Sequence, residues 1–182
     1  AEELEHDVER KRREFQGYVD RLIGPRYDDQ GNTKEVNPNS NQQLRKLFFD
    51  ELKLVGRGTS TDKLNRERIK KHPGTSEEAR ELLIALDIYK IDQKFHSTYA
   101  TSRIDVDGRF RPEWKQFGTK KAPGRLSSSQ NMWGTAQNMQ NQPVRAYKMY
   151  IADPGWMFSY FDLSQAEARV VAYLWRVKGL IE

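Results

Sequence analysis

The 182-residue sequence contains no cysteine. This absence excludes disulfide scaffolds, thiol nucleophiles and zinc or iron–sulfur sites built on cysteine. The histidines, His6, His72 and His96, are too scattered to suggest a histidine-rich metal site. No run of about 18 apolar residues occurs, and the charged first residues lack the apolar region of a signal peptide. We therefore expect a protein that does not cross a membrane, in a reducing, cytoplasmic compartment.

Apolar residues are also scarce. Hydrophobic residues make up 36% of the sequence and charged residues 31%, which is polar for a globular chain. Either the core is small, or another polypeptide completes part of the apolar surface. The 31 Lys and Arg exceed the 26 Asp and Glu, and the resulting net charge of +5 permits an anionic partner such as nucleic acid.

Helical periodicity dominates the first hundred residues. Two capping-box patterns are present, in which Ser40 precedes Gln43 and Thr75 precedes Glu78. The apolar spacing, together with Gly-Pro and Pro-Gly stops, predicts helices over residues 2–23, 41–54, 62–72 and 76–99.

The second half has a different pattern. A turn at Asp107-Gly108 predicts a hairpin. Residues 118–143 are almost wholly polar, and a structureless loop of this length is usually functional or disordered. Residues 156–163 predict a buried strand, and a last helix is expected from Ser164 to about Lys178. Helices followed by a hairpin, a strand and a helix indicate an α+β fold.

Asp162 is a candidate metal ligand because it ends the predicted strand just before a helix. A carboxylate in that place suits Mg²⁺, which takes one or two such oxygens together with substrate phosphates. The alternative is a simple cap or turn residue. Ser164 and Glu167 form a capping-box pattern, so Glu167 and the neighbouring Gln165 are either functional or only part of a helix start.

Three polar segments could contact nucleic acid. The Gly124–Ser129 segment offers small donors beside a cation, which suits phosphates. The amides of residues 137–142 suit base edges in a minor groove. The basic helix 62–72 could follow a phosphate backbone. Each has a plain alternative as a polar surface loop or a solvated helix face, and the basic run at residues 10–13 is best interpreted as such a face.

Eight segments, in collinear order along the chain, resemble family A DNA polymerases, the DNA polymerase I type. The last of them matches motif A of that family, and the GRLSSS stretch is nearly as specific. The residues around Asn131 to Ala136 and the segment DLSQAEAR (162–169) are typical of phage members. The segments are VNPNSNQQLRKLFFDEL (36–52), GTST (58–61), KHP (71–73), FHSTY (95–99), DGR (107–109), PGRLSSS (123–129), QNMQNQP (137–143) and YFDLSQAEARVVAYL (160–174).

The resemblance implies a right-hand polymerase fold with thumb, palm and fingers. Residues 1–36 would form the palm base, residues 37–100 the helical thumb that grips the duplex, and residues 101–182 a palm segment that carries motif A and part of an antiparallel sheet.

The resemblance also implies roles for particular residues. Asp162 would be the catalytic aspartate that holds two Mg²⁺ ions, and the Leu163 carbonyl would lie beside the second ion. Gln165 would lie near the incoming dNTP, and Glu167 would crowd the ribose 2′ side. Contacts to the minor groove and primer strand are implied for Arg125, Asn138 and Gln140, and thumb contacts to the duplex backbone for Asn39, Ser40, Ser60, Lys94 and Ser97.

Some features depart from the family pattern. Leu163 replaces a common Tyr, and Ala166 and Ala168 replace larger aliphatic residues, which affects packing more than chemistry. The sequence ends at Glu182, just after motif A, so the fingers helix and the second catalytic carboxylate are expected in a separate C-terminal polypeptide. With it, the chain would add dNTPs to a primer 3′-OH on primer–template DNA by two-metal phosphoryl transfer. The alternatives are a non-catalytic duplex-DNA-binding module and a polar helical scaffold.

Overall fold

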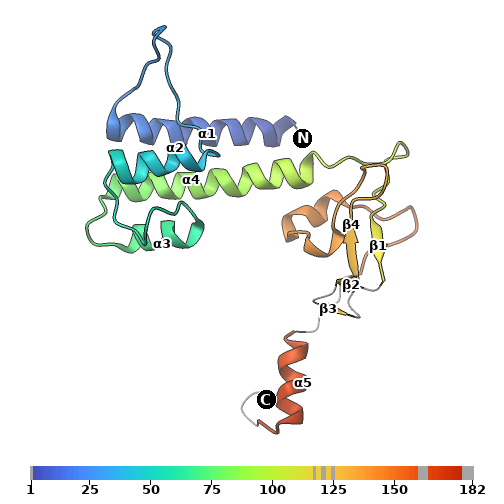
Figure 1. The fold of residues 1–182 in the computed structure, drawn as a ribbon. Helices are drawn as coiled ribbons and strands as arrows, with labels where there is room; N and C mark the ends of the chain where they lie inside the picture. Colours follow the sequence, from blue (N-terminus) through green and yellow to red (C-terminus); the bar gives the residue numbers. More distant parts are fainter. Residues whose placement is uncertain (1, 117, 120–121, 124–125, 160–163, 178–182) are drawn as a thin grey trace. The chain divides into compact units, whose positions relative to one another are not determined.

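The computed structural model of the protein describes residues 2–116, 118–119, 122–123, 126–159 and 164–177. Residue contacts divide the chain into two units, Ala1–Gln140 and Asn141–Glu182. Long helices and short antiparallel strands make up the first unit, so the fold is α+β (Figure 1). None of the helices in these ranges combines the length and the hydrophobicity that a membrane crossing requires.

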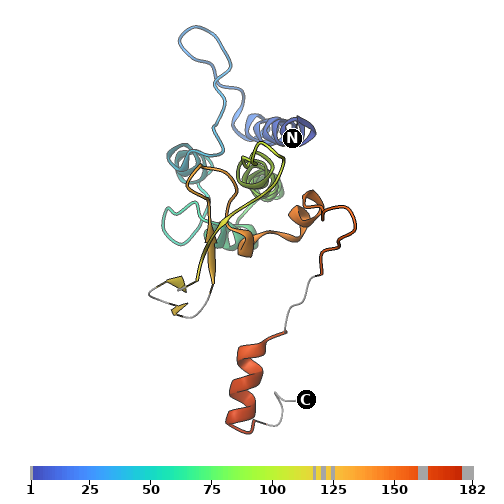
Figure 2. The same ribbon diagram turned by 90° about the vertical axis from the view of Figure 1, so that its right-hand side faces the viewer.

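Two long helices lie side by side in the helical part of the first unit (Figure 1, Figure 2). The first, α1 (Glu2–Ile23), confirms the predicted helix, and it ends where Gly24 adopts a φ of +77° before Pro25. The second, α4, and the remaining helices confirm the other three predictions. They are α2 (Asn41–Arg45) with its π-helical continuation η1 (Lys46–Glu51), α3 (Lys63–Lys71), and α4 (Glu77–Phe95) with its π-helical continuation η2 (His96–Ala100).

Side-chain caps fix where α2 and α3 begin. Ser40 Oγ accepts a hydrogen bond from the Gln43 amide at 3.4 Å, and Asp62 Oδ1 accepts one from the Asn65 amide at 2.7 Å. Ser40 is therefore the predicted cap of α2. The second half of the box differs, because Gln43 Oε1 accepts from the Asn37 amide at 2.7 Å and so ties the preceding turn to the helix.

The cap of α4 lies one residue later than predicted. Ser76 Oγ accepts from the Ala79 amide at 3.2 Å. Thr75 is buried, and its hydroxyl donates to the Ile69 carbonyl at 2.7 Å. The predicted capping box of Thr75 with Glu78 is therefore wrong, because the buried Thr75 hydroxyl already satisfies a carbonyl at the end of α3.

One hydrophobic core joins the helices of this part. Full burial of a Leu or Phe side chain contributes roughly 1.5–3 kcal/mol, so this cluster is the main source of stability. It brings the first helix and the residues after position 36 into a single packed unit. Its buried members are Phe15, Val19, Val36, Leu44, Leu47, Phe48, Ile69, Leu82, Leu83 and Leu86.

Short strands follow the helices. The segment 118–143, predicted to be a structureless loop, contains antiparallel pairing at residues 118–119, 122–123 and 127–129, which satisfies part of the backbone there. The predicted turn at Asp107-Gly108 is present: the Gly108 amide donates to the Asp105 carbonyl, and the Asp105 amide to the Arg109 carbonyl, each at 2.9 Å. The predicted hairpin is not, since no strand flanks the turn in the described residues and the following strand pairs with residues 127–129 instead. The paired strands are β1 (Glu113–Lys115) with β4 (Ser127–Ser129) and β2 (Gly118–Thr119) with β3 (Ala122–Pro123).

The second unit contains the 3₁₀ helix η4 (Val144–Met149) and α5 (Ala166–Leu174). The predicted buried strand over 156–163 is wrong for residues 156–159, which are exposed and form no strand; Met157, for example, is 85% exposed. A strand needs a neighbour to satisfy its backbone groups, and no strand in the described ranges pairs with this run. The remainder, 160–163, lies outside those ranges.

The start of α5 also differs from the prediction. Gln165 precedes the helix with a φ of +51°, and it makes no side-chain cap. The helix therefore begins at Ala166, two residues after the predicted start at Ser164, while the capping box of Ser164 with Glu167 stays a prediction. An aliphatic and aromatic face of α5 is exposed, at Val170, Val171, Tyr173 and Leu174.

Candidate nucleic-acid interface

Two predicted thumb contacts lie at the end of α4. Lys94 and Ser97 are exposed, and Ser97 Oγ donates to the Lys94 carbonyl at 3.4 Å. Lys90 lies one helical turn before Lys94, so the two lysines share one face of α4. Lys90 is not among the predicted contacts. The sequence could have indicated it, because a residue four positions before Lys94 in a helix lies on the same face.

A third predicted contact, Ser60, lies at a polar pocket of about 390 Å³. The pocket contains three cationic side chains and a single carboxylate, together with hydroxyl and amide groups. This combination suits an anion such as a phosphate. The lining residues are Asn41, Arg45, Ser60, Thr61, Asp62, Arg66 and Lys90.

Hydrogen bonds hold Ser60 in place at the start of α3. Its hydroxyl donates to Asp62 Oδ2 at 2.6 Å, and its carbonyl accepts from Asn65 Nδ2 at 2.6 Å. The hydrogen bond from Ser60, followed by the one from the Asn65 amide, lowers the pKa of Asp62 below its ordinary value. Asp62 is therefore charged at neutral pH and acts as the cap of α3.

Arg66 forms the buried wall of the pocket. Its guanidinium donates to Asp87 Oδ1, with Nε at 2.7 Å, and to the Thr61 carbonyl. Lys70 donates to the other oxygen of Asp87 at 2.8 Å. Burial acts to lower the pKa of Lys70, but its hydrogen bonds to Asp87 and Glu67 outweigh burial and raise that pKa. Asp87 thus compensates two cations.

Lys90 has a different environment from Lys70. Burial lowers its pKa below the ordinary value, the nearby Arg66 charge lowers it further, and Asp87 acts in the opposite direction. In the part of the chain that the structure describes, Lys90 has no hydrogen bond or ion pair. An anion in the pocket would compensate this partly desolvated charge.

The loop before α2, which contains Asn39 and Ser40, is tied to the same region. Asn39 Nδ2 donates to the Tyr89 hydroxyl on α4 at 2.9 Å. Thr61 Oγ1 donates to Asn41 Oδ1 at 3.1 Å, which joins the start of α2 to the loop at Ser60.

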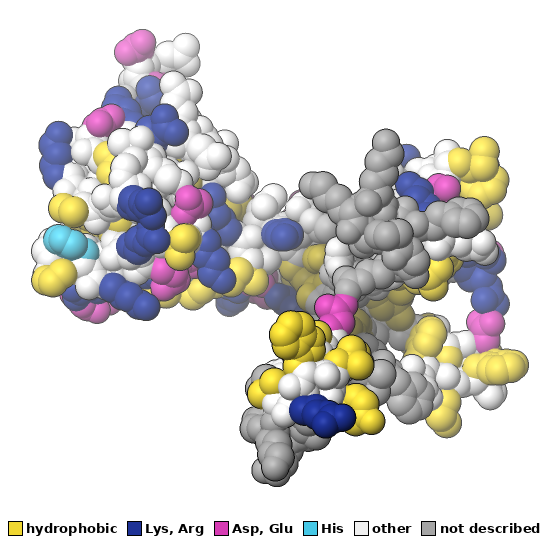
Figure 3. Space-filling view, turned by 60° about the horizontal axis from the view of Figure 1, so that its bottom comes forward, with side chains coloured by type: hydrophobic (Ala, Val, Ile, Leu, Met, Phe, Trp, Pro, Cys, Tyr) yellow, Lys and Arg dark blue, Asp and Glu magenta, His cyan; other side chains and the backbone are white. Residues whose placement is uncertain are grey.

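Lys and Arg side chains gather over the helical part, with a few carboxylates between them (Figure 3).

Asn138 and Gln140, the predicted minor-groove contacts, are attached to β4. The Asn138 Oδ1 accepts from the Ser128 hydroxyl and from the Gln140 amide, both at 2.9 Å. Gln140 Nε2 donates to the Leu126 carbonyl at 2.7 Å. The structure therefore brings these two amides together, whereas the third predicted member of this group, Arg125, lies outside the described residues.

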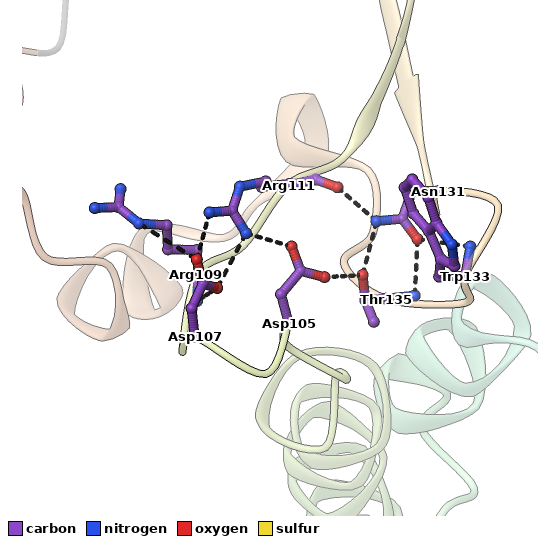
Figure 4. A network of polar contacts seen from close by, with 7 residues as sticks. All are labelled: Asp105, Asp107, Arg109, Arg111, Asn131, Trp133 and Thr135. Atoms are coloured by element: carbon purple, nitrogen blue, oxygen red, sulfur yellow. Dashed lines mark hydrogen bonds and ion pairs between the residues drawn. The ribbon is translucent and has the colours of Figure 1, made fainter.

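A second polar network joins the Asp107 turn to the loop after β4 (Figure 4). Arg111 donates to Asp107 Oδ2 at 2.5 Å and to Asp105 Oδ2 at 2.7 Å, and the Thr135 hydroxyl donates to Asp105 Oδ1 at 2.5 Å. The hydrogen bonds from Arg111, with help from the Arg109 amide, lower the pKa of Asp107 to about 2. The Thr135 and Arg111 hydrogen bonds lower the pKa of Asp105.

Acid is expected to break the ion pairs of Asp107 in this network by protonating its carboxylate. Because its folded pKa is depressed from 3.8 to about 2, its contribution to stability is complete above pH 3.8 and is lost as the pH falls toward 2. A ¹³C NMR titration of the Asp107 carboxyl, assigned with Asp107→Asn, should have its midpoint near 2. A midpoint at the ordinary aspartate value would contradict the hydrogen-bonded geometry.

The predicted metal and nucleotide site is described only in part. Gln165 and Glu167 are exposed at the start of α5, and Glu167 lies in its first turn. Asp162 and Leu163 lie outside the described residues. The described ranges contain no group of three His, Asp or Glu that could hold a metal ion. A carboxylate and a carbonyl are the hard oxygen donors that Mg²⁺ takes, but two donors do not complete its coordination.

Comparison with known proteins identifies relatives over most of the chain. The sequence profile described as DNA polymerase family A matches residues 5–182. DNA polymerase I of Chloroflexus aurantiacus is 34% identical over 158 residues, which cover 80% of this chain and 16% of that protein. The thermostable DNA polymerase I of Thermus filiformis is 32% identical, covering 95% and 20% of the two chains.

A phage protein matches at a similar level. The DNA polymerase of Escherichia phage T5 is 31% identical over 153 residues, covering 80% of this chain and 17% of that protein. The chain thus spans about a fifth or less of the length of these three relatives. Bacterial and phage relatives match about equally well, so the resemblance to phage members stays a prediction.

Proposed function

The chain belongs to DNA polymerase family A, and we propose that it forms the thumb and the first half of the palm of a DNA-directed DNA polymerase. The helices of residues 37–100 would be the thumb. Residues 1–36 and 101–182 would belong to the palm. The assembled enzyme would add dNTPs to the 3′ end of a primer on a DNA template.

The pocket at Ser60 is the observation that carries the DNA-binding part of this proposal. A predicted backbone contact lies there beside Lys90, a half-buried cation that has no protein partner in the described ranges. Lys94 on α4 and Ser97 on its continuation η2 extend this row, and the phosphates of one DNA strand are spaced regularly enough to meet it. Contacts of this kind give sequence-independent affinity, which a polymerase needs.

The chemistry would centre on motif A. In this proposal the Asp162 carboxylate and the Leu163 carbonyl hold Mg²⁺, Gln165 lies near the new base pair, and Glu167 crowds the ribose 2′ side and so favours deoxynucleotides. When bound, Mg²⁺ lowers the pKa of the primer 3′-hydroxyl and stabilises charge on the leaving phosphates. The hydroxyl attacks the α-phosphate, and pyrophosphate leaves.

Two-metal chemistry also needs a second metal-binding carboxylate and cations for the triphosphate. In this proposal a fingers and palm segment supplies them. We propose a companion C-terminal polypeptide as their source. Primer extension that requires both components is the expected behaviour, and robust extension by the 182 residues alone would contradict it.

Duplex binding is expected to be steeply salt-dependent, and Lys90 should carry one of the phosphate contacts. In Lys90→Gln, the slope of log Kd against log salt should fall by about 0.9, because one fewer counterion is released. Fluorescence anisotropy with a labelled blunt duplex, at several salt concentrations, measures this slope. Lys34→Gln removes an equal charge from the exposed loop between α1 and α2 and should leave the slope unchanged.

The outcomes separate the candidate functions. Absence of salt-dependent duplex binding would contradict the proposed thumb, and equal effects of the two substitutions would show that only net charge matters. Duplex binding without metal-dependent extension, with every C-terminal half tried, would favour a non-catalytic DNA-binding module instead.

A further inference from the structure

Two large apolar side chains are exposed on the loop after β4. Met132 is 83% exposed and Trp133 is 75% exposed. Both belong to a six-residue turn, Asn131–Ala136, in a segment that is otherwise polar. An exposed Trp beside polar groups has an apolar ring face available for a partner.

The turn that carries Trp133 is rigidly held. Asn131 Oδ1 accepts from the Trp133 amide at 3.1 Å and from the Thr135 amide at 3.0 Å. Asn131 Nδ2 donates to the Arg111 carbonyl at 2.9 Å and to Thr135 Oγ1 at 2.7 Å (Figure 4). Gly134, with a φ of +74°, closes the turn through its amide, which donates to the Asn131 carbonyl at 3.0 Å.

The same network sets the electrostatic surroundings of the turn. The Ala136 amide donates to the Arg103 carbonyl at 2.7 Å, so the turn is fixed between the backbones of Arg103 and Arg111. These two arginines and Arg109 are exposed, and they outnumber the two carboxylates of the network, Asp105 and Asp107. The exposed Glu113 of β1, whose strand partner Ser129 lies two residues before the turn, brings the charges close to balance. The exposed apolar ring face is therefore the distinctive feature of the turn.

We propose that Trp133 stacks on an unpaired base of a bound DNA strand; this inference rests on the proposed function. Stacking needs one accessible ring face, and the hydrogen-bonded turn fixes the backbone that carries the exposed indole. The turn leads directly into Asn138 and Gln140, the predicted minor-groove contacts, so the ring lies a few residues from the proposed duplex contacts. The flexible Met132 beside it gives an adaptable apolar edge.

The size of the apolar surface argues against a protein partner. A stable protein interface buries about 800 Å² on each side and involves roughly 20 residues. Met132 and Trp133 are the only large apolar residues in the turn, and they lie beside polar and charged groups. A single base, in contrast, matches the area of one indole ring.

Binding of tailed and blunt DNA by the 182-residue chain tests the proposal. The probes are a labelled blunt duplex, the same duplex with a single-stranded oligo(dT) tail, and the free oligo(dT) strand. Trp133→Ala should weaken binding of the tailed and single-stranded probes about fivefold or more, and binding of the blunt duplex less than twofold. Trp133→Phe should retain part of the affinity. Trp156→Ala, which removes another strongly exposed Trp, should have no effect.

Fluorescence gives a second readout that does not depend on an affinity change. In a variant with Trp114→Phe, Trp156→Phe and Trp175→Phe, Trp133 is the only tryptophan left. Addition of the tailed probe should quench its emission, because stacked bases quench indole, and the blunt duplex should quench it much less.

Each outcome decides the proposal. Unchanged affinity in Trp133→Ala together with absent quenching would overturn base stacking, while salt-dependent binding of the blunt duplex would leave the proposed function standing. Absence of binding to all three probes would overturn both. If sedimentation shows self-association that Trp133→Ala abolishes, the turn is a contact between copies of the chain, and base stacking is likewise overturned.

Discussion

Replacing Asp162 with alanine is expected to reduce primer extension by about a thousandfold. A metal clamp on the reacting oxygens supplies several kcal/mol of transition-state stabilisation, and about 4 kcal/mol corresponds to this factor. The measurement combines the 182-residue chain with the C-terminal half of a family A polymerase and follows extension of a labelled primer with dNTPs and Mg²⁺.

Two comparisons make the Asp162 result specific. Asp153→Ala removes an exposed carboxylate nine positions earlier and should extend primers at nearly the original rate. Asp162→Ala itself should bind duplex DNA with unchanged affinity and salt slope, because Asp162 has no proposed contact with the DNA backbone. Extension by Asp162→Ala near the original rate would mean that this carboxylate does not hold the catalytic metal.

Replacing Asp87 with alanine is expected to lower the free energy of unfolding by about 3–5 kcal/mol. Asp87 accepts from Arg66 Nη2 at 2.6 Å and from Lys70 Nζ at 2.8 Å, and all three side chains are largely buried. Without Asp87, two buried cations lose their common partner. Urea unfolding at neutral pH, followed by circular dichroism, measures the change.

Matched variants separate this effect from loss of a surface charge. Glu67→Ala removes only the exposed partner of Lys70 and should cost about 1 kcal/mol or less. A triple variant, Arg66→Met with Lys70→Met and Asp87→Leu, removes all three buried charges together and should recover much of the stability. If Asp87→Ala costs no more than Glu67→Ala, Asp87 is not the compensating group that its geometry indicates.

The helices of the first hundred residues were predictable because their signals are local. The apolar spacing and the Gly24-Pro25 stop predict α1 as it is observed. The cap of α4 was harder to predict, because the hydroxyl of Thr75 can serve either as a helix cap or, as observed, as a donor to the Ile69 carbonyl. Whether the apolar run 156–159 lies in a strand depends on a neighbouring strand, and no local pattern carries that information.

The contacts of the candidate interface stay predictions, and the sequence indicated them unevenly. The resemblance to the family indicated Ser60 and Ser97 within the GTST and FHSTY segments, and Lys94 directly before the second of them. It did not indicate Lys90, whose role depends on the burial of its stem beside Arg66 and on the absence of a protein partner in the described ranges. Such properties arise only when α3 and α4 pack together. Trp133 was visible in the sequence, but its rigid support by Asn131 was not.

The packing of α1 along α4 has a practical consequence for reagent production. Phe15 and Val19 cover the same core as Leu86, and Lys11 contacts the buried carboxylate of Asp92. A shortened gene that starts at residue 37 would leave that core open to solvent and Asp92 without its lysine. We expect this fragment to be expressed as insoluble aggregates. A shortened DNA-binding fragment of the protein therefore has to include α1.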